Sequence, residues 1–146
     1  MKPNWKYFKL SEFTKSNTAS KLGFINTPLE SDIQNLDLLV SNILDPLREA
    51  WGKPIIITSG FRVPRLNEVV GGVENSDHLY GKAADIVPSD PNDFKEFTEF
   101  LKDWLKDKEF KQCIIEKSGN TKWIHISYDP NNNKKQILKL NKSPKK

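Results

Sequence analysis

This chain contains only two histidines, and they constrain its fold more than any other feature. His78 lies in the polar, glycine-containing segment 76–85, which ends at Asp85, and His125 lies much later, within residues 123–127. Neutral imidazole and carboxylate groups are the usual protein donors to Zn²⁺, and two histidines with one acid leave a fourth position for water. The sequence therefore predicts that His78, Asp85 and His125 bind one zinc ion, which requires the fold to bring both segments together.

The spacing between His78 and Asp85 is too wide for one face of a helix. Gly81 and the small residues Ala83 and Ala84 allow the chain to form a tight loop between the two donors. Taken alone, each histidine is better explained as a surface or hydrogen-bonded side chain than as a metal ligand. Their polar neighbours together favour the metal site.

Apolar residues that recur every three or four positions predict two amphipathic helices. The first spans Pro28–Trp51, with a kink at Pro46 because proline lacks a backbone donor. The second begins near Pro91, and its buried face is expected to consist of Phe94, Phe97, Leu101, Trp104 and Leu105. A short capped helix over Leu10–Ser16, followed by a break at Gly23, completes the prediction for the N-terminal half.

Five short segments, the first of them a run of β-branched residues, predict strands. They are Pro54–Thr58, Ala84–Val87, Gln112–Glu116, Lys122–Tyr128 and Gln136–Leu140, with a helical turn over Pro64–Val70 after the first. Tight turns join the late strands, and the long helices lie outside them. This order predicts an α+β fold, a small and mostly antiparallel sheet flanked by helices.

Alternation along a strand decides which side chains share a face. In the strand at 122–128, Trp123 and His125 point to one face and the isoleucines between them to the other. The strand before it places Ile114 and Glu116 on one face. If the two strands pair as a hairpin across residues 117–121, Glu116 lies at the mouth of the predicted metal site.

The chain is long enough for one ordinary domain, with roughly two thirds of its unfolded surface buried. We expect a single domain over residues 1–141 and a disordered basic tail over 142–146. The single cysteine, Cys113, excludes an internal disulfide and lies in an apolar run, where a buried small hydrophobe is expected. The net charge of +4 suits a polyanion, but no basic helix face or motif supports nucleic-acid binding, and we expect a monomer.

Several motifs in order along the chain resemble the zinc D-Ala-D-Ala carboxypeptidase-like (LAS-type) peptidases. This group also includes phage endolysin L-alanyl-D-glutamate peptidases and is related to the hedgehog and lysostaphin folds. The region from about residue 55 to 128 carries the resemblance, and residues 8–28 also look like its smaller phage and bacterial members. The matching motifs are Ser59-Gly60-Phe61-Arg62, Asn67, Val70-Gly71-Gly72, Ser76-x-His78-x-x-Gly81-x-Ala83-x-Asp85 and Trp123-Ile124-His125-Ile126-Ser127.

Carried over to these positions, the resemblance implies that the three predicted donors are the zinc ligands. It makes Arg62 a substrate-orienting or oxyanion-stabilising cation and Ser76 a contact to the substrate or to the ligands. Tyr80 and Trp123 are expected to line the sides of the cleft, although packing against other side chains explains each of them at least as well.

The catalytic base departs from the common pattern of the group. Many relatives carry an acid three residues before the last zinc histidine, where this chain has Lys122. Glu116 resembles the acid that other members place on the preceding strand, and it is the predicted base. Asp77 and Asp129 are the alternatives.

The resemblance implies a zinc metallopeptidase that cleaves an amide bond in the peptide stem of bacterial peptidoglycan, as a carboxypeptidase or as an endolysin-type endopeptidase. A catalytically silent wall-binding or virion module is the alternative, motivated by Lys122. No apolar run approaches the roughly 20 residues of a membrane span, and no signal peptide is recognisable at the start. We therefore expect a protein, possibly encoded by a phage, that is made in the cytoplasm and acts at the cell wall or periplasm.

Overall fold

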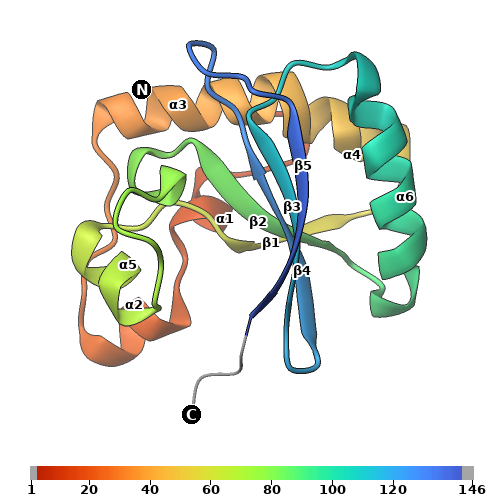
Figure 1. Cartoon of the computed structure of the whole chain (residues 1–146). Helices are drawn as coiled ribbons and strands as arrows, with labels where there is room; N and C mark the ends of the chain where they lie inside the picture. The colour runs from red at the N-terminus through yellow and green to blue at the C-terminus, as the bar shows by residue number, and fades with distance from the viewer. Residues whose placement is uncertain (1–2, 143–146) are drawn as a thin grey trace.

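A five-stranded sheet forms the centre of the molecule (Figure 1). The computed structural model describes residues 3–142. The strands are β1 (Ile55–Ser59), β2 (Ala83–Pro88), β3 (Gln112–Ser118), β4 (Thr121–Ser127) and β5 (Gln136–Lys142). The α-helices are α1 (Leu10–Thr14), α2 (Asn17–Leu22), α3 (Glu30–Leu39), α4 (Asp45–Trp51), α5 (Pro64–Val69) and α6 (Phe94–Trp104). Short helical segments are η1 (Val40–Leu44), η2 (Asp77–Tyr80), η3 (Pro91–Asp93) and η4 (Leu105–Asp107).

The strand order is β1-β2-β4-β3-β5, and every neighbouring pair is antiparallel except β3 and β5. The predicted α+β class is confirmed, and all five predicted strands are present. The hairpin of β3 and β4 is tighter than expected, because Ser118 pairs with Thr121 and only Gly119 and Asn120 remain in the turn. The parallel β5 was not predicted, since strand direction across a sheet depends on the path of the loop over residues 128–135.

One face of the sheet is apolar and carries the core. Ile86, Cys113, Ile124 and Ile126 are buried on this face. They belong to one hydrophobic cluster with the inner faces of α3, α4 and α6, which lie across the top and down the right side of Figure 1. Burial raises the pKa of the Cys113 thiol to about 12, so this residue is a neutral core side chain, as expected. The other face of the sheet is left for polar side chains.

The predicted long helix is interrupted just before Pro46. A π-helical turn, η1, separates α3 from α4, and the N–H of Asp45 donates to the carbonyl of Val40, five residues back. Pro46 then occupies the first turn of α4, where its missing N–H costs nothing. The irregularity expected at Pro46 is therefore a local change from α-helical to π-helical hydrogen bonding in the turn before the proline.

The N-terminal helix prediction was incomplete. The helix expected over residues 10–16 ends at Thr14, and a second helix, α2, follows it. Its start is set by Ser16, whose hydroxyl accepts a hydrogen bond from the N–H of Ala19 (3.1 Å), and its end by Gly23 with φ of 74°. The propensities of six residues were too weak a signal to identify α2 beside α1.

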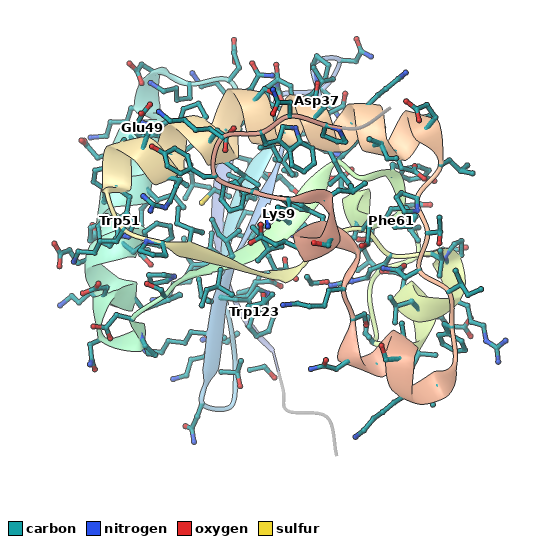
Figure 2. All side chains as sticks on the ribbon, turned by 180° about the vertical axis from the view of Figure 1, so that it is seen from behind. Lys9, Asp37, Glu49, Trp51, Phe61 and Trp123 are labelled. Carbon is teal, nitrogen blue, oxygen red and sulfur yellow. The ribbon has the colours of Figure 1, made fainter. Side chains whose placement is uncertain are left out.

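The segment ahead of α1 lies along α3 and α4. Trp5 Nε1 donates to Asp37 (2.7 Å), and Lys6 Nζ pairs with Glu49 (Figure 2). No helix among residues 3–142 is both long enough and apolar enough to cross a bilayer. Apart from the last residue of β5, the basic tail expected over 142–146 lies outside the described residues.

Candidate metal centre

The three predicted zinc ligands lie together on the polar face of the sheet. Asp85 on β2 is directly opposite His125 on β4 in the antiparallel register, and His78 approaches from η2. One carboxylate oxygen, Asp85 Oδ1, is 3.2 Å from His78 Nε2 and 3.2 Å from His125 Nδ1. One ligand atom from each residue can be chosen so that all three lie within 4.8 Å of one another. The fold has therefore brought the two predicted segments to one point.

The loop that carries His78 is held by its backbone. The hydroxyl of Ser76 accepts a hydrogen bond from the N–H of His78 (3.2 Å) and caps η2. Gly81 ends η2 with φ of 73°, and a Cβ there would overlap the backbone carbonyl of Asp32. Only glycine meets both conditions, and the tight loop that Gly81 was predicted to allow between His78 and Asp85 is present.

The hydrogen bond of His78 to the backbone fixes which ring nitrogen faces the centre. Nδ1 lies 2.6 Å from the carbonyl oxygen of Gly60, which can only accept, so Nδ1 carries the proton. In the neutral ring, Nε2 then turns its lone pair toward the Asp85 carboxylate, and two acceptors face each other. A cation between them removes this conflict, and an outer hydrogen bond of this kind is typical of zinc-binding histidines.

The charge state of Asp85 suits the same role. Burial raises its pKa, but the charges and hydrogen bonds of His78 and His125 outweigh this effect and hold the pKa well below its ordinary value. Asp85 is therefore ionised and able to bind a cation. The donor set of two imidazoles and one carboxylate fits Zn²⁺ and leaves a fourth tetrahedral position, which defines a catalytic type of zinc centre.

Arg62 is bound into the wall of this centre by three hydrogen bonds. Its Nη2 pairs with Asp85 Oδ2 (3.3 Å), while Nε donates to Ser59 (3.0 Å) and Nη1 to Asn67 (3.1 Å). Burial lowers the pKa of the Arg62 guanidinium, and the charges of Asp85 and Glu116 raise it. Three of the five guanidinium N–H groups are engaged in these bonds.

Glu116 and Trp123 form a second pair on the same face. They are opposite each other in the β3–β4 register, and Trp123 Nε1 donates to Glu116 Oε2 at 2.8 Å. Glu116 is buried, with 6% of its surface exposed, so this carboxylate is oriented by its surroundings. Lys122 precedes Trp123 and lies on the other face of β4, with its ammonium over the ring of Phe94.

The two alternative bases are both held in ion pairs. Asp77 pairs with Lys111 at 2.9 Å, and Asp129 pairs with Lys82 at 3.1 Å. Asp77 lines the cleft described below, whereas Asp129 does not. Lysine partners therefore engage both of these carboxylates, whereas Glu116 accepts a hydrogen bond from the neutral indole of Trp123.

A cleft of about 680 Å³ joins these features. Its lining includes Arg62, Ser76, His78, Asp85, Glu116, Trp123 and His125. Tyr80, the remaining predicted site residue, does not line this cleft and is half exposed. His78 and Tyr80 are two residues apart in the helical turn η2, so their side chains point in different directions. His78 is buried in the site, whereas Tyr80 points toward solvent.

Two residues of the site had no role assigned from the sequence. Asn67 is buried and links Arg62 to the carbonyl of Val73, to which it donates at 2.8 Å. Lys111 lines the cleft and neutralises Asp77. Asn67 is one of the residues that carry the family resemblance, and this could have indicated its place in the site. Nothing in the local sequence distinguishes Lys111 from the other lysines.

Comparison with known proteins shows the family to which the chain belongs. Residues 6–127 match the sequence model of the peptidase M15 family, and the chain belongs to that family. Over 44 residues it is 50% identical to the zinc D-Ala-D-Ala carboxypeptidase of Streptomyces albus G, a match that covers 30% of this chain and 17% of that protein. Among the described residues, His78, Asp85 and His125 form a group that could hold a zinc ion.

Proposed function

We propose that this protein hydrolyses an amide bond in the peptide stem of bacterial peptidoglycan. The observation that carries the proposal is the cleft in which the three-donor centre lies with Glu116 and Arg62. The similarity to a zinc D-Ala-D-Ala carboxypeptidase supports the choice of substrate class. Its action would then be at the cell wall.

The metal-binding side chains, Glu116 and Trp123 each have a defined task in this proposal. His78, Asp85 and His125 hold zinc, which when bound supplies Lewis-acid polarisation and lowers the pKa of water toward about 7. Glu116 accepts the proton of the attacking water and returns it to the leaving amine. Trp123 holds the Glu116 carboxylate through its indole N–H.

Arg62 has two tasks that its geometry allows together. Its bond to Asp85 Oδ2 leaves Oδ1 directed at the two histidines, so it positions the ligand. Its two remaining N–H groups can stabilise the negative charge that develops on the scissile carbonyl oxygen or hold a substrate carboxylate. Ser76 and Trp123 line the cleft and are proposed to contact the peptide.

The bond cleaved can be identified from the products. Purified peptidoglycan digested by the protein should yield new peptide termini, which mass spectrometry of the muropeptides assigns to a carboxypeptidase or to an endolysin-type endopeptidase. Glu116→Gln should lower turnover by at least about 100-fold, since general base catalysis contributes about 10²–10⁴-fold. The variant should still bind one zinc ion per chain.

His125→Ala is the matched test of the metal centre. It should lose both zinc and activity, whereas Glu116→Gln should lose activity alone. Full activity in the His125→Ala variant would overturn the assignment of the centre. Unchanged turnover in the Glu116→Gln variant would show that the base lies elsewhere.

The alternative of a catalytically silent module was motivated by Lys122. In the structure this lysine lies on the face of β4 away from the cleft, and Glu116 supplies a carboxylate within the cleft. The departure at position 122 therefore gives no support to loss of catalysis.

A further inference from the structure

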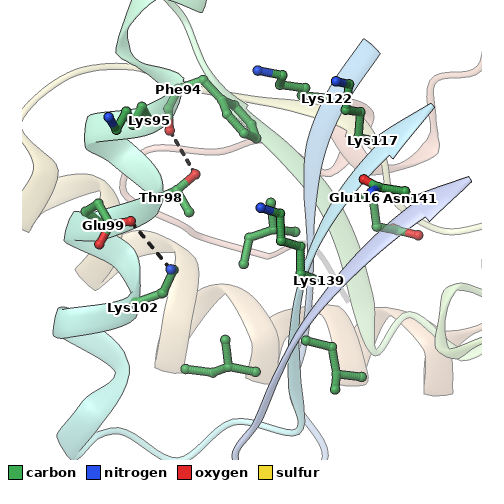
Figure 3. A pocket seen from close by; sticks show the side chains of 13 residues that line it. Phe94, Lys95, Thr98, Glu99, Lys102, Glu116, Lys117, Lys122, Lys139 and Asn141 are labelled. Atoms are coloured by element: carbon green, nitrogen blue, oxygen red, sulfur yellow. Dashed lines mark hydrogen bonds and ion pairs between the residues drawn. The ribbon is translucent and has the colours of Figure 1, made fainter. Parts of the chain in front are cut away.

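A second groove lies on the helix-covered side of the sheet, near the end at which β3 and β4 join. It has a volume of about 580 Å³ and runs between α6 and strands β3–β5 (Figure 3). Phe94, Ile115 and Ile137 give it an apolar floor, and 42% of the surface of Ile137 is exposed. Apart from Glu116, which also lines the catalytic cleft, the residues of the groove have no task in the proposed hydrolysis.

The lining of this groove is strongly basic. Two glutamates lie among its residues, Glu99 and Glu116, and the second is bonded to Trp123, which lines the other cleft. The catalytic cleft is balanced by comparison, with three cationic and three acidic side chains. The lysines of the groove number five: Lys95, Lys102, Lys117, Lys122 and Lys139.

Most of these lysines lack an acidic partner. Among residues 3–142, Lys95, Lys117, Lys122 and Lys139 form no ion pair, and Lys102 has only a 3.5 Å contact with Glu99. Figure 3 shows Lys102 reaching from α6 and Lys139 from β5 into the space between them. Like charges gathered without counterions repel one another, and a bound polyanion would relieve that repulsion.

We propose that this groove binds a phosphodiester-linked anionic polymer of the cell wall, of the poly(glycerol phosphate) type. The lysines would contact successive phosphates, and the apolar floor would contact the carbon backbone between them. A flat bilayer cannot reach the floor of a concave groove. Single-stranded nucleic acid is disfavoured because it needs aromatic platforms, and the one aromatic ring here, Phe94, is covered by Lys122.

The choice of a wall polymer rests on the proposed function, whereas the charge argument does not. Groove and catalytic cleft lie on opposite faces of the same pair of strands, β3 and β4. A polymer held in one therefore leaves the other open to a peptide. Binding would keep the protein close to peptidoglycan that carries such polymers and so raise the local substrate concentration.

Calorimetric titration with purified poly(glycerol phosphate) teichoic acid tests the proposal. Lys122→Gln/Lys139→Gln should weaken binding by roughly tenfold and reduce its salt dependence between about 50 and 200 mM salt. The matched control is Lys9→Gln/Lys21→Gln, which removes the same charge from exposed positions around α1 and α2. It should bind as the unmodified chain does.

Two results would overturn the proposal: equal binding by the two double variants, or tighter binding of a single-stranded DNA oligonucleotide than of the polymer. Binding is also measured with Glu116→Gln, so that loss of hydrolysis and loss of polymer binding are scored separately. The groove variant should hydrolyse a soluble stem peptide at the unmodified rate and lose activity only on polymer-bearing walls.

Discussion

Gly72 shows how far the metal centre depends on residues outside the ligand set. A Cβ at this position would overlap the side-chain oxygen of Asn67 and lie 2.8 Å from Arg62 Nη1. Asn67 in turn holds the guanidinium that pairs with Asp85. The absence of a side chain at Gly72 therefore allows the network that orients a zinc ligand.

Gly72→Ala should displace Asn67 and Arg62 and weaken zinc binding by roughly 10–100-fold, the usual effect of removing an outer partner of a ligand. Competition with a chelator of known affinity measures this. Val73→Ala is the control, because that neighbouring side chain is 72% exposed and should leave zinc affinity unchanged. Equal zinc affinity in Gly72→Ala and the unmodified chain would contradict the positioning role of Asn67 and Arg62.

The sequence predicted that His78, Asp85 and His125 come together, because donor residue types restrict the chemistry, and the structure brings these side chains to one place. Glu116 lies in the same cleft, and its role as base stays a prediction. The hydrogen bonds of these residues were not predictable. Whether Arg62 faces the substrate or braces Asp85 depends on distances between β2 and the loop after β1, and no local pattern encodes them. The inward His78 and outward Tyr80 likewise depend on the 3₁₀ geometry of η2, which the sequence did not reveal.

At the scale of elements, α6 shows where periodicity predicts packing well. Phe97, Leu101 and Leu105 are fully buried, as the spacing predicted, while Phe94 and Trp104 at the edge of the stripe are partly exposed. Phe97 also contacts Trp51 of α4 in an edge-to-face arrangement, with ring centroids 5.1 Å apart. This contact joins α4 and α6, two of the helices that cover the sheet.

Phe97→Ala should lower the free energy of unfolding by about 3–5 kcal/mol, because it leaves a cavity in the core. Urea unfolding monitored by circular dichroism measures the change. Phe100→Ala removes the same ring from a partly exposed position beside Trp51 and should cost less than half as much. Equal losses in the two variants would show that the junction between α4 and α6, rather than burial, sets the cost.

At the scale of the whole molecule, zinc should connect parts of the chain that are far apart in sequence. Its ligands come from η2, β2 and β4, so a folded chain is needed to assemble the site. An ion that binds only the folded state stabilises it by about 2.7 kcal/mol when present at 100 times its dissociation constant. The fold and the metal centre should therefore depend on each other.

Addition of zinc to the metal-free protein should raise the melting temperature by about 5–10 °C, given about 2–4 °C per kcal/mol for a chain of this size. Thermal unfolding with and without a chelator measures the shift. His125→Ala should show little of it. A full shift in that variant would place the stabilising zinc at another site.

The sequence by itself determined the class of fold, the five strands and the donor set of the metal centre, because hydrophobic periodicity and donor chemistry are local properties of the chain. Only the tertiary structure decided the order of the strands, the parallel β5, the bonds of Arg62 and the basic groove between α6 and the sheet. Each of these features forms where separate elements pack together. Loop paths and side-chain packing determine how the elements pack, and no single segment of the sequence encodes them.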